Sequence, residues 1–122
     1  MINILWVAAG GAVGATMRYF TINLLKYISP NFPLGTLTVN IVGSFFIGFL
    51  VSYMENKNIS SHIIKYFFII GILGSFTTFS AFSFEIIDML NSRKFVMSLF
   101  YVITSTLTCI VCCYLGYNLN KI

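Results

Sequence analysis

Charge is scarce in this 122-residue chain, which has seven Lys or Arg, three Asp or Glu and one His. Asp, Glu, Lys and Arg together make up 8% of the residues, against about 25% in soluble domains. The composition therefore excludes a soluble domain. The basic residues are scattered and form no stripe, so no nucleic-acid partner is expected. His–Cys and Ser–His pairs, a metal-ligand cluster and a phosphate loop are also missing, so we do not expect an enzyme.

Cysteine is equally sparse. Cys109, Cys112 and Cys113 all fall in one apolar segment, with no His or acid beside them. A disulfide scaffold is therefore not expected, and neither is a metal site. The three residues are interpreted as small apolar side chains of a membrane helix.

Four long apolar segments take up most of the chain, which is 58% hydrophobic. Each is long enough to cross about 30 Å of hydrocarbon as a helix, and connectors rich in Pro, Asn, Ser and charge separate them. We expect an all-α integral membrane protein, with residues 1–122 as a single four-helix transmembrane domain. Its expected location is the cell membrane (an inner or plasma membrane), as a multi-pass protein. The segments cover residues 4–28, 34–54, 63–90 and 95–119.

The third segment contains a stretch, residues 71–85, that mixes Gly, Ser and Thr with closely spaced Phe. Gly, Ser and Thr are mediocre helix formers, so a break in the third helix is predicted, over Gly74 to Thr77. A broken helix is tolerated in a bilayer only where its freed backbone groups face protein or a water-filled path. We interpret the stretch as the lining of an ion or substrate route.

With Arg18 of the first segment set aside, the Lys and Arg residues are balanced between the two sides of the membrane. With four crossings, one side carries Lys57, Lys65 and Lys121, and the other carries Lys26, Arg93 and Lys94. A bias in these residues normally fixes the orientation. Two interpretations are open: a weakly biased protein that inserts one way, or insertion both ways, with two inverted copies forming an antiparallel dual-topology homodimer.

The first segment holds a Gly-x-x-x-Gly surface, Gly10 to Gly14, followed one turn later by Arg18. The glycines are typical of close helix packing. Arg18 either snorkels to the headgroups or places a fixed positive charge at the mouth of an anion route. The first two segments contain no acid, which disfavours cation transport.

In the second segment, Thr36, Asn40 and Gly43 share one helical face, which suits either a pore wall or a tight helix contact. Asn40 is costly to bury without partners. It either bonds to another helix or aims an N–H donor at a passing anion.

In the third segment, Phe79 and Phe82 are neighbours on a helix face. They either pack or turn their positive ring edges to a small anion. In the fourth, Tyr101, Ser105 and Cys109 form a stripe that either bonds to its own helix or supplies donors facing the Phe pair. Glu85 and Asp88 are candidates for the aqueous end of the route.

Three blocks of residues together resemble the Fluc (CrcB-type) fluoride channels, and the likeness follows the whole chain in order. The blocks are Gly10-Gly11-x-x-Gly14-Ala15-x-x-Arg18-Tyr19, Gly35-Thr36-Leu37-x-Val39-Asn40-x-x-Gly43-Ser44-Phe45 and Gly74-x-x-Thr77-Thr78-Phe79-Ser80-x-Phe82.

The resemblance implies an antiparallel, dual-topology homodimer with two fluoride pores. It implies a passive channel that lets fluoride leave the cytoplasm and so reduces its toxicity. Pairing with a related second subunit stays open beside self-pairing. Fluoride, the lipid bilayer and a second copy are thus the expected partners.

The resemblance also assigns roles to residues. Asn40 would donate to fluoride, with Thr36 on the same face, and Phe79 and Phe82 would offer ring edges. Ser80, Tyr101 and Ser105 would belong to a polar track, and Arg18 would lie near the vestibule. The backbone carbonyls of Gly74 and Thr77 would hold a structural sodium ion at the dimer centre. Cys109 departs from the expected Ser or Thr of the track, and a thiol is the weaker donor.

The alternative function is a small dual-topology multidrug/proton antiporter, which is also built from four short helices. Such a protein needs a membrane carboxylate, typically in its first helix. The first segment here carries Arg18 and no acid.

Overall fold

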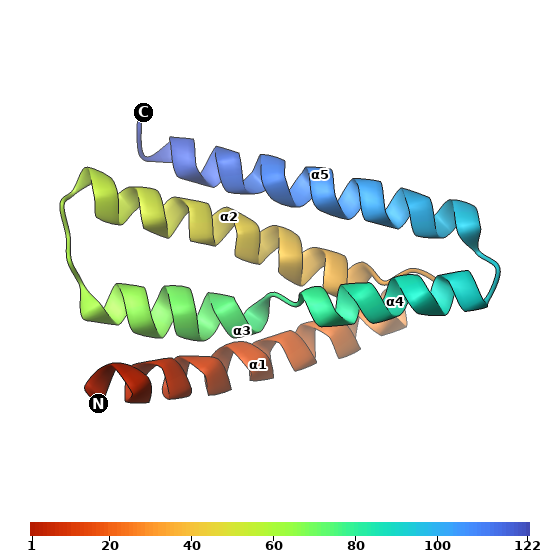
Figure 1. The fold of residues 1–122 in the computed structure, drawn as a ribbon, viewed down its shortest axis with the longest axis horizontal. Coiled ribbons are helices and arrows are strands. Elements are labelled where there is room, and N and C mark those ends of the chain that lie inside the picture. Colours follow the sequence, from red (N-terminus) through yellow and green to blue (C-terminus); the bar gives the residue numbers. More distant parts are fainter.

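The computed structural model describes residues 1–122 and is entirely helical (Figure 1). Its helices agree with the four predicted segments to within two residues at each end; the first begins at Ile2 and the second ends at Asn56. The third segment is divided into three successive helices. The elements are α1 (Ile2–Ile28), α2 (Leu34–Asn56), η1 (Ile63–Leu73), α3 (Gly74–Phe76), α4 (Phe79–Asn91) and α5 (Phe95–Leu119).

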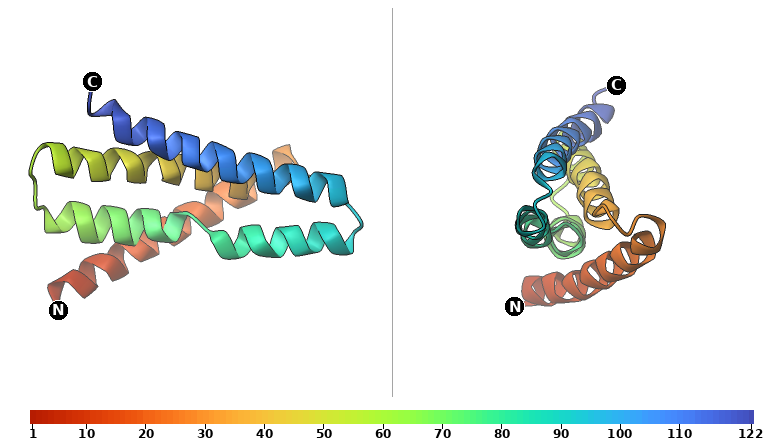
Figure 2. Two further views of the ribbon diagram at one scale, coloured as in Figure 1. Left: turned by 45° about the horizontal axis from the view of Figure 1, so that its top comes forward. Right: turned by 90° about the vertical axis from the view of Figure 1, so that its right-hand side faces the viewer.

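The helices run back and forth along one long axis. α2 and α5 lie side by side, and η1, α3 and α4 follow one another along a parallel line beside them (Figures 1 and 2). α1 packs on η1 and α3 and crosses the outside of the bundle at an angle. Both termini and the α2–η1 turn lie at one end, and the α1–α2 and α4–α5 turns lie at the other. The two groups of three basic residues therefore lie at opposite ends.

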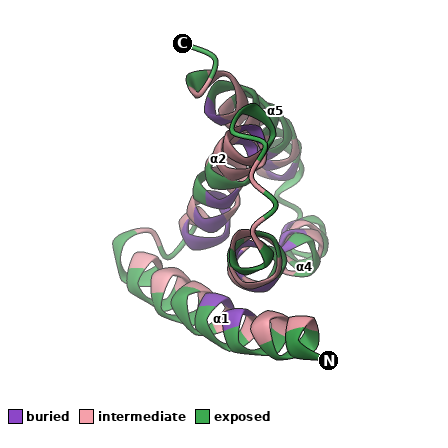
Figure 3. Cartoon of the chain, turned by 90° about the vertical axis from the view of Figure 1, so that its left-hand side faces the viewer, coloured by how far each residue is buried: buried purple, intermediate pink, exposed green.

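Three helical stretches are long and apolar enough to cross a membrane: Leu34–Asn56, Ile63–Asn91 and Phe95–Leu119. α1 has 27 residues, which is enough to span about 30 Å by length alone. Only 19 of the 122 residues are buried, and many large apolar residues on every long helix are exposed; exposed and intermediate residues therefore make up most of the cartoon in Figure 3. Such a surface suits a bilayer rather than water.

Glycines allow two close helix contacts. A Cβ atom added to Gly10 of α1 would lie 2.9 Å from the Cα of Gly71 in η1, and one added to Gly71 would lie 2.8 Å from the Cα of Gly10. At the α2–α5 contact, a Cβ on Gly48 would lie 3.0 Å from the backbone N of Tyr117. A larger side chain would push these helices apart. Gly10 therefore has the packing role that its spacing predicts.

The chain leaves helical geometry at two residues between α3 and α4. Thr77 has φ −77° and ψ 153°, and Thr78 has φ −150° and ψ 113°. Thr78 is the N-cap of α4, since its hydroxyl accepts a hydrogen bond from the Ala81 N–H at 3.2 Å. Gly74 remains helical. Extended geometry is thus confined to the paired threonines, which cap a new helix better than they continue an old one.

The helix before this interruption is π-helical over η1, which the sequence pattern did not predict. π-Helical turns are rare and often occur near functional sites. Just after η1, the Ser75 hydroxyl donates to the carbonyls of Gly71 and Ile72 at 2.7 and 3.1 Å. This one extra donor is shared between two carbonyls at the end of the irregular helix.

Candidate ion pathway

Asn40 holds the interruption in place. Its Nδ2 donates to the backbone carbonyl of Thr78 at 3.1 Å, and the Thr78 N–H donates to its Oδ1 at 2.8 Å. A primary amide carries two N–H donors, so one remains beyond the bond to Thr78. The predicted interhelical hydrogen bond is present, and it leaves a donor for a second partner.

A cavity of about 420 Å³ lies beside Asn40, between α2, the interruption and α5; we call it the Phe pocket. Five other residues predicted for the pathway or the metal site line this cavity together with Asn40. The lining residues are Asn40, Gly43, Ser44, Ile47, Leu73, Gly74, Thr77, Thr78, Phe79, Phe82, Ser105, Thr106, Cys109 and Ile110. Neither Ser44 nor Thr106 was assigned a pathway role of its own from the sequence, although Ser44 belongs to the second sequence block and lies one turn beyond Asn40.

Three aromatic rings contact one another in a row that begins in this pocket. The ring centroids of Phe79 and Phe82 are 5.5 Å apart, and Phe82 and Tyr101 meet edge to face at 5.1 Å. Phe82 and Tyr101 are buried, whereas Phe79 is 78% exposed in a single copy. The predicted contact within the Phe pair is confirmed, and α5 faces that pair as its stripe of polar residues indicated.

The Tyr101 hydroxyl forms a hydrogen bond with a carboxylate inside the bundle. Its hydroxyl donates to Oε2 of Glu85 at 2.6 Å, and the Thr36 hydroxyl donates to Oε1 at 2.5 Å. Tyr101 and Thr36 are almost fully buried. The sequence showed an acid within an apolar segment, but it did not reveal these two partners. An anion following the rings would therefore meet two hydroxyl donors already engaged by an internal carboxylate.

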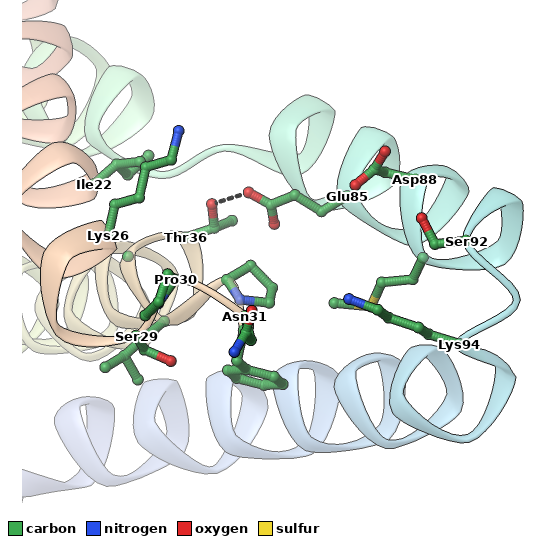
Figure 4. Close-up of a pocket in the computed structure, with 15 residues that line it drawn as sticks. Ile22, Lys26, Ser29, Pro30, Asn31, Thr36, Glu85, Asp88, Ser92 and Lys94 are labelled. Carbon is green, nitrogen blue, oxygen red and sulfur yellow. Dashed lines mark hydrogen bonds between the residues drawn. The ribbon is translucent and has the colours of Figure 1, made fainter.

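A second cavity, of about 340 Å³, opens on the other side of Glu85 (Figure 4); we call it the Glu85 pocket. Thr36 and Glu85 belong to its wall and do not line the Phe pocket, whereas Tyr101 lines neither cavity. Few of the residues that line it are hydrophobic. They are Ile22, Lys26, Ser29, Pro30, Asn31, Phe32, Pro33, Leu34, Gly35, Thr36, Glu85, Asp88, Met89, Ser92 and Lys94.

The carbonyls of Gly74 and Thr77 lack the donors that an unbroken α-helix would supply. The Thr78 N–H, which would reach Gly74, donates to Asn40, and the Ala81 N–H, which would reach Thr77, donates to the Thr78 hydroxyl. Neither oxygen accepts any of the backbone bonds that join separate elements. Free carbonyl oxygens are suitable ligands for a hard cation. The donor set therefore fits the predicted sodium site.

Three predicted residues line neither pocket: besides Tyr101, these are Arg18 and Ser80. Arg18 is half-buried on α1, and its Nε atom is buried without a hydrogen-bond partner. Ser80 is exposed, and its hydroxyl lies 3.2 Å from that of Thr78. A single copy thus does not bring these two residues into the pathway.

Two interpretations were given for the polar side chains of α5: bonding to their own helix, or facing the Phe pair. Both arrangements occur. Beside the stripe, the Thr108 hydroxyl bonds back to the carbonyl of Thr104 at 2.6 Å, which is the local alternative. Ser105 and Cys109 line the Phe pocket, and Tyr101 bonds to Glu85. The stripe therefore faces the Phe pocket at Ser105 and Cys109, and it contacts Glu85 at Tyr101.

Residues 5–117 match the family of CrcB-like proteins, described as camphor resistance (CrcB). The chain belongs to the CrcB family. Relatives named fluoride-specific ion channel FluC share 42% identity in Campylobacter fetus (98% of this chain, 94% of the relative) and 40% in Agrobacterium fabrum (99% and 98%). FluC 3 of Methanosarcina barkeri is 39% identical (95% and 88%).

Membership of the CrcB family confirms the resemblance inferred from the three sequence blocks. The relatives are named as ion channels, so this is a family of channels rather than of enzymes. With its apolar helices, the chain is a multi-pass membrane protein.

Proposed function

We propose that the chain is a fluoride-selective channel in which the ion passes from the Phe pocket, past Tyr101, to the Glu85 pocket. The observation that carries this proposal is the second Asn40 N–H, which is left beside Phe79 and Phe82 after the bond to Thr78. A small anion can accept that hydrogen and contact the positive edges of both rings. No acid lines the Phe pocket.

Fluoride as the particular anion rests on the relatives, which are named fluoride-specific channels. The direction follows from acid–base chemistry. Neutral hydrogen fluoride crosses a bilayer and ionises inside, and the resulting ion faces a Born cost of tens of kcal/mol in hydrocarbon. A passive, lined route then lets fluoride leave the cytoplasm and limits its toxicity.

The proposed assembly is an antiparallel homodimer of two four-helix domains, with α1 as the fourth crossing and the α3–α4 interruption as the break. Three basic residues at each end of the helical bundle support insertion in both orientations. Gly74 and Phe79 are exposed in one copy although they line the Phe pocket, so a second copy can complete that pocket. Arg18 and Ser80 would join the pathway at this interface. A reporter enzyme fused to the C-terminus tests the orientation: activity on one side only contradicts dual insertion.

We also propose that the carbonyls of Gly74 and Thr77 hold a structural sodium ion between the two copies. Two oxygens from each copy give four ligands, and their helical donors are diverted to Asn40 and to the Thr78 hydroxyl. When bound, such an ion would hold the copies together and offset nearby negative charge. Replacing sodium by N-methylglucamine during purification is expected to weaken the dimer; an unchanged dimer would remove this role.

The deciding experiment is ion flux from liposomes that contain the purified protein. We expect fluoride to pass and chloride to be strongly excluded; equal flux of both ions, or of neither, contradicts the proposal. The antiporter alternative is not favoured, since α1 carries Arg18 and no acid.

A further inference from the structure

Two lysines from different parts of the chain line the Glu85 pocket. Lys26 comes from the last turn of α1, and Lys94 is the residue immediately before α5. Figure 4 shows them on opposite sides of the cavity, with Glu85 and Thr36 between them. Both lysines are exposed, as is Asp88, which lies one turn beyond Glu85 on α4. The pocket thus contains two cations and two carboxylates around the end of the proposed pathway.

The two carboxylates alone would disfavour an anion here. Glu85 is fixed by Thr36 and Tyr101, and Asp88 adds a second negative charge in the same cavity. A cleft lined by charge of one sign focuses its field and lowers the local concentration of ions of that sign. Opposing positive charge is therefore needed at this mouth if an anion is to pass.

Helix stability explains Lys26 but not Lys94. A cation in the last turn of a helix is favoured by the helix dipole, which applies to Lys26. Lys94 is at the N-cap of α5, where a positive charge is disfavoured and where its side chain makes no capping hydrogen bond. Its backbone N–H donates to the Met89 carbonyl at the end of α4 at 2.8 Å, where a positive charge is favoured, so the two helix dipoles act on Lys94 in opposite directions. The dipole of α5 does not favour the charge of Lys94, but the position of Lys94 in the pocket wall gives that charge a role.

We propose that Lys26 and Lys94 form an electrostatic mouth that offsets Glu85 and Asp88 and gathers fluoride in the Glu85 pocket. The inference rests on the proposed function and assigns two residues to it. Neither lysine needs to bind the ion tightly. Each raises the local anion concentration by its field, and such an effect falls as added salt screens the charge.

The test is single-channel fluoride current in planar bilayers of neutral lipid, for wild type, Lys26→Gln, Lys94→Gln and the double variant. Currents are first recorded at an ionic strength of about 0.01 M, with fluoride as the only anion. They are recorded again after an inert sulfate salt has raised the ionic strength to about 1 M. Lys57→Gln is the matched control, because Lys57 is exposed and lines neither pocket. We expect the double variant to lose about threefold or more of the current at low salt and to approach wild type at high salt.

The outcomes separate this inference from the proposed function. Wild type without fluoride current contradicts the function itself. Normal wild-type current with an unchanged double variant, or an equal loss in Lys57→Gln, contradicts only the electrostatic mouth. Lysines can also hold lipid phosphate, so the currents are repeated with anionic lipid added. A loss that is seen only with anionic lipid would assign the lysines to headgroups and overturn their role in gathering fluoride.

Discussion

The Asn40 side chain forms two hydrogen bonds with the backbone of a single residue, Thr78, which is 38 positions away in the sequence. One bond donates to the Thr78 carbonyl and the other accepts from its N–H. Asn40 therefore acts like a neighbouring strand for one residue of non-helical chain. Because the same amide faces the Phe pocket, the geometry of the interruption and the proposed ion contact depend on one side chain.

Asn40→Asp is expected to abolish most fluoride flux. A carboxylate can still accept from the Thr78 N–H, but it has no donor for the Thr78 carbonyl or for an anion, and it repels the anion. The loss of one hydrogen bond costs about 1 kcal/mol, with more for a carbonyl left unpaired. Flux from liposomes and thermal unfolding in detergent measure the two effects. Asn23→Asp is the control, since exposed Asn23 bonds only to Tyr19 of its own helix; unchanged flux in Asn40→Asp would remove Asn40 from the pathway.

Phe79→Ala and Phe82→Ala are expected to differ in stability and to agree in function. Phe82 belongs to the small buried core with Leu37, Met89 and Tyr101, and truncating a buried Phe typically costs about 3–5 kcal/mol. Phe79 is mostly exposed in one copy, so its truncation should leave the fold of that copy intact. Both variants are expected to lower fluoride flux. A stable Phe79→Ala protein with wild-type flux would contradict the role of that ring.

Glu85→Gln is expected to destabilise the bundle by about 1–3 kcal/mol, because one of its two hydroxyl partners loses an acceptor. Glu55→Gln is the matched control: Glu55 also accepts from a tyrosine, Tyr117, at 2.6 Å, but that pair is exposed to solvent. A double-mutant cycle with Tyr101→Phe measures the coupling, which we expect at about 0.5–3 kcal/mol. Coupling near zero would show that the Tyr101–Glu85 bond contributes nothing to stability.

Gly10→Ala and Gly11→Ala test the α1–η1 contact at adjacent positions. A Cβ at Gly10 would collide with the Phe67 carbonyl and the Gly71 backbone, whereas one at Gly11 meets nothing within 4 Å. Overpacking at Gly10 should cost about 1–3 kcal/mol. At Gly11 the better helix propensity of Ala should stabilise the folded protein by up to about 1 kcal/mol. Thermal unfolding of both variants in detergent provides the comparison, and equal stability would contradict the close approach of the two helices.

The helices could be predicted from the sequence because apolar length and polar connectors are local properties. The Phe79–Phe82 contact was predictable for the same reason, since it lies within one helical turn. The partners of Asn40 and Glu85 were not, because they lie on other helices and depend on how those helices pack. The π-helical geometry of η1 also escaped prediction: its run of Ile and Phe carries no signal that distinguishes it from an α-helix.

The diverted hydrogen bonds at the α3–α4 interruption have a consequence for the life of the protein in the cell. A lone copy in the bilayer carries two carbonyl oxygens, those of Gly74 and Thr77, without their helical donors, and a backbone group left unpaired in hydrocarbon costs several kcal/mol. A second copy and a cation that satisfied them would stabilise the folded chain by mass action. Unassembled copies would then be the least stable population, and they would be the first that membrane proteases remove.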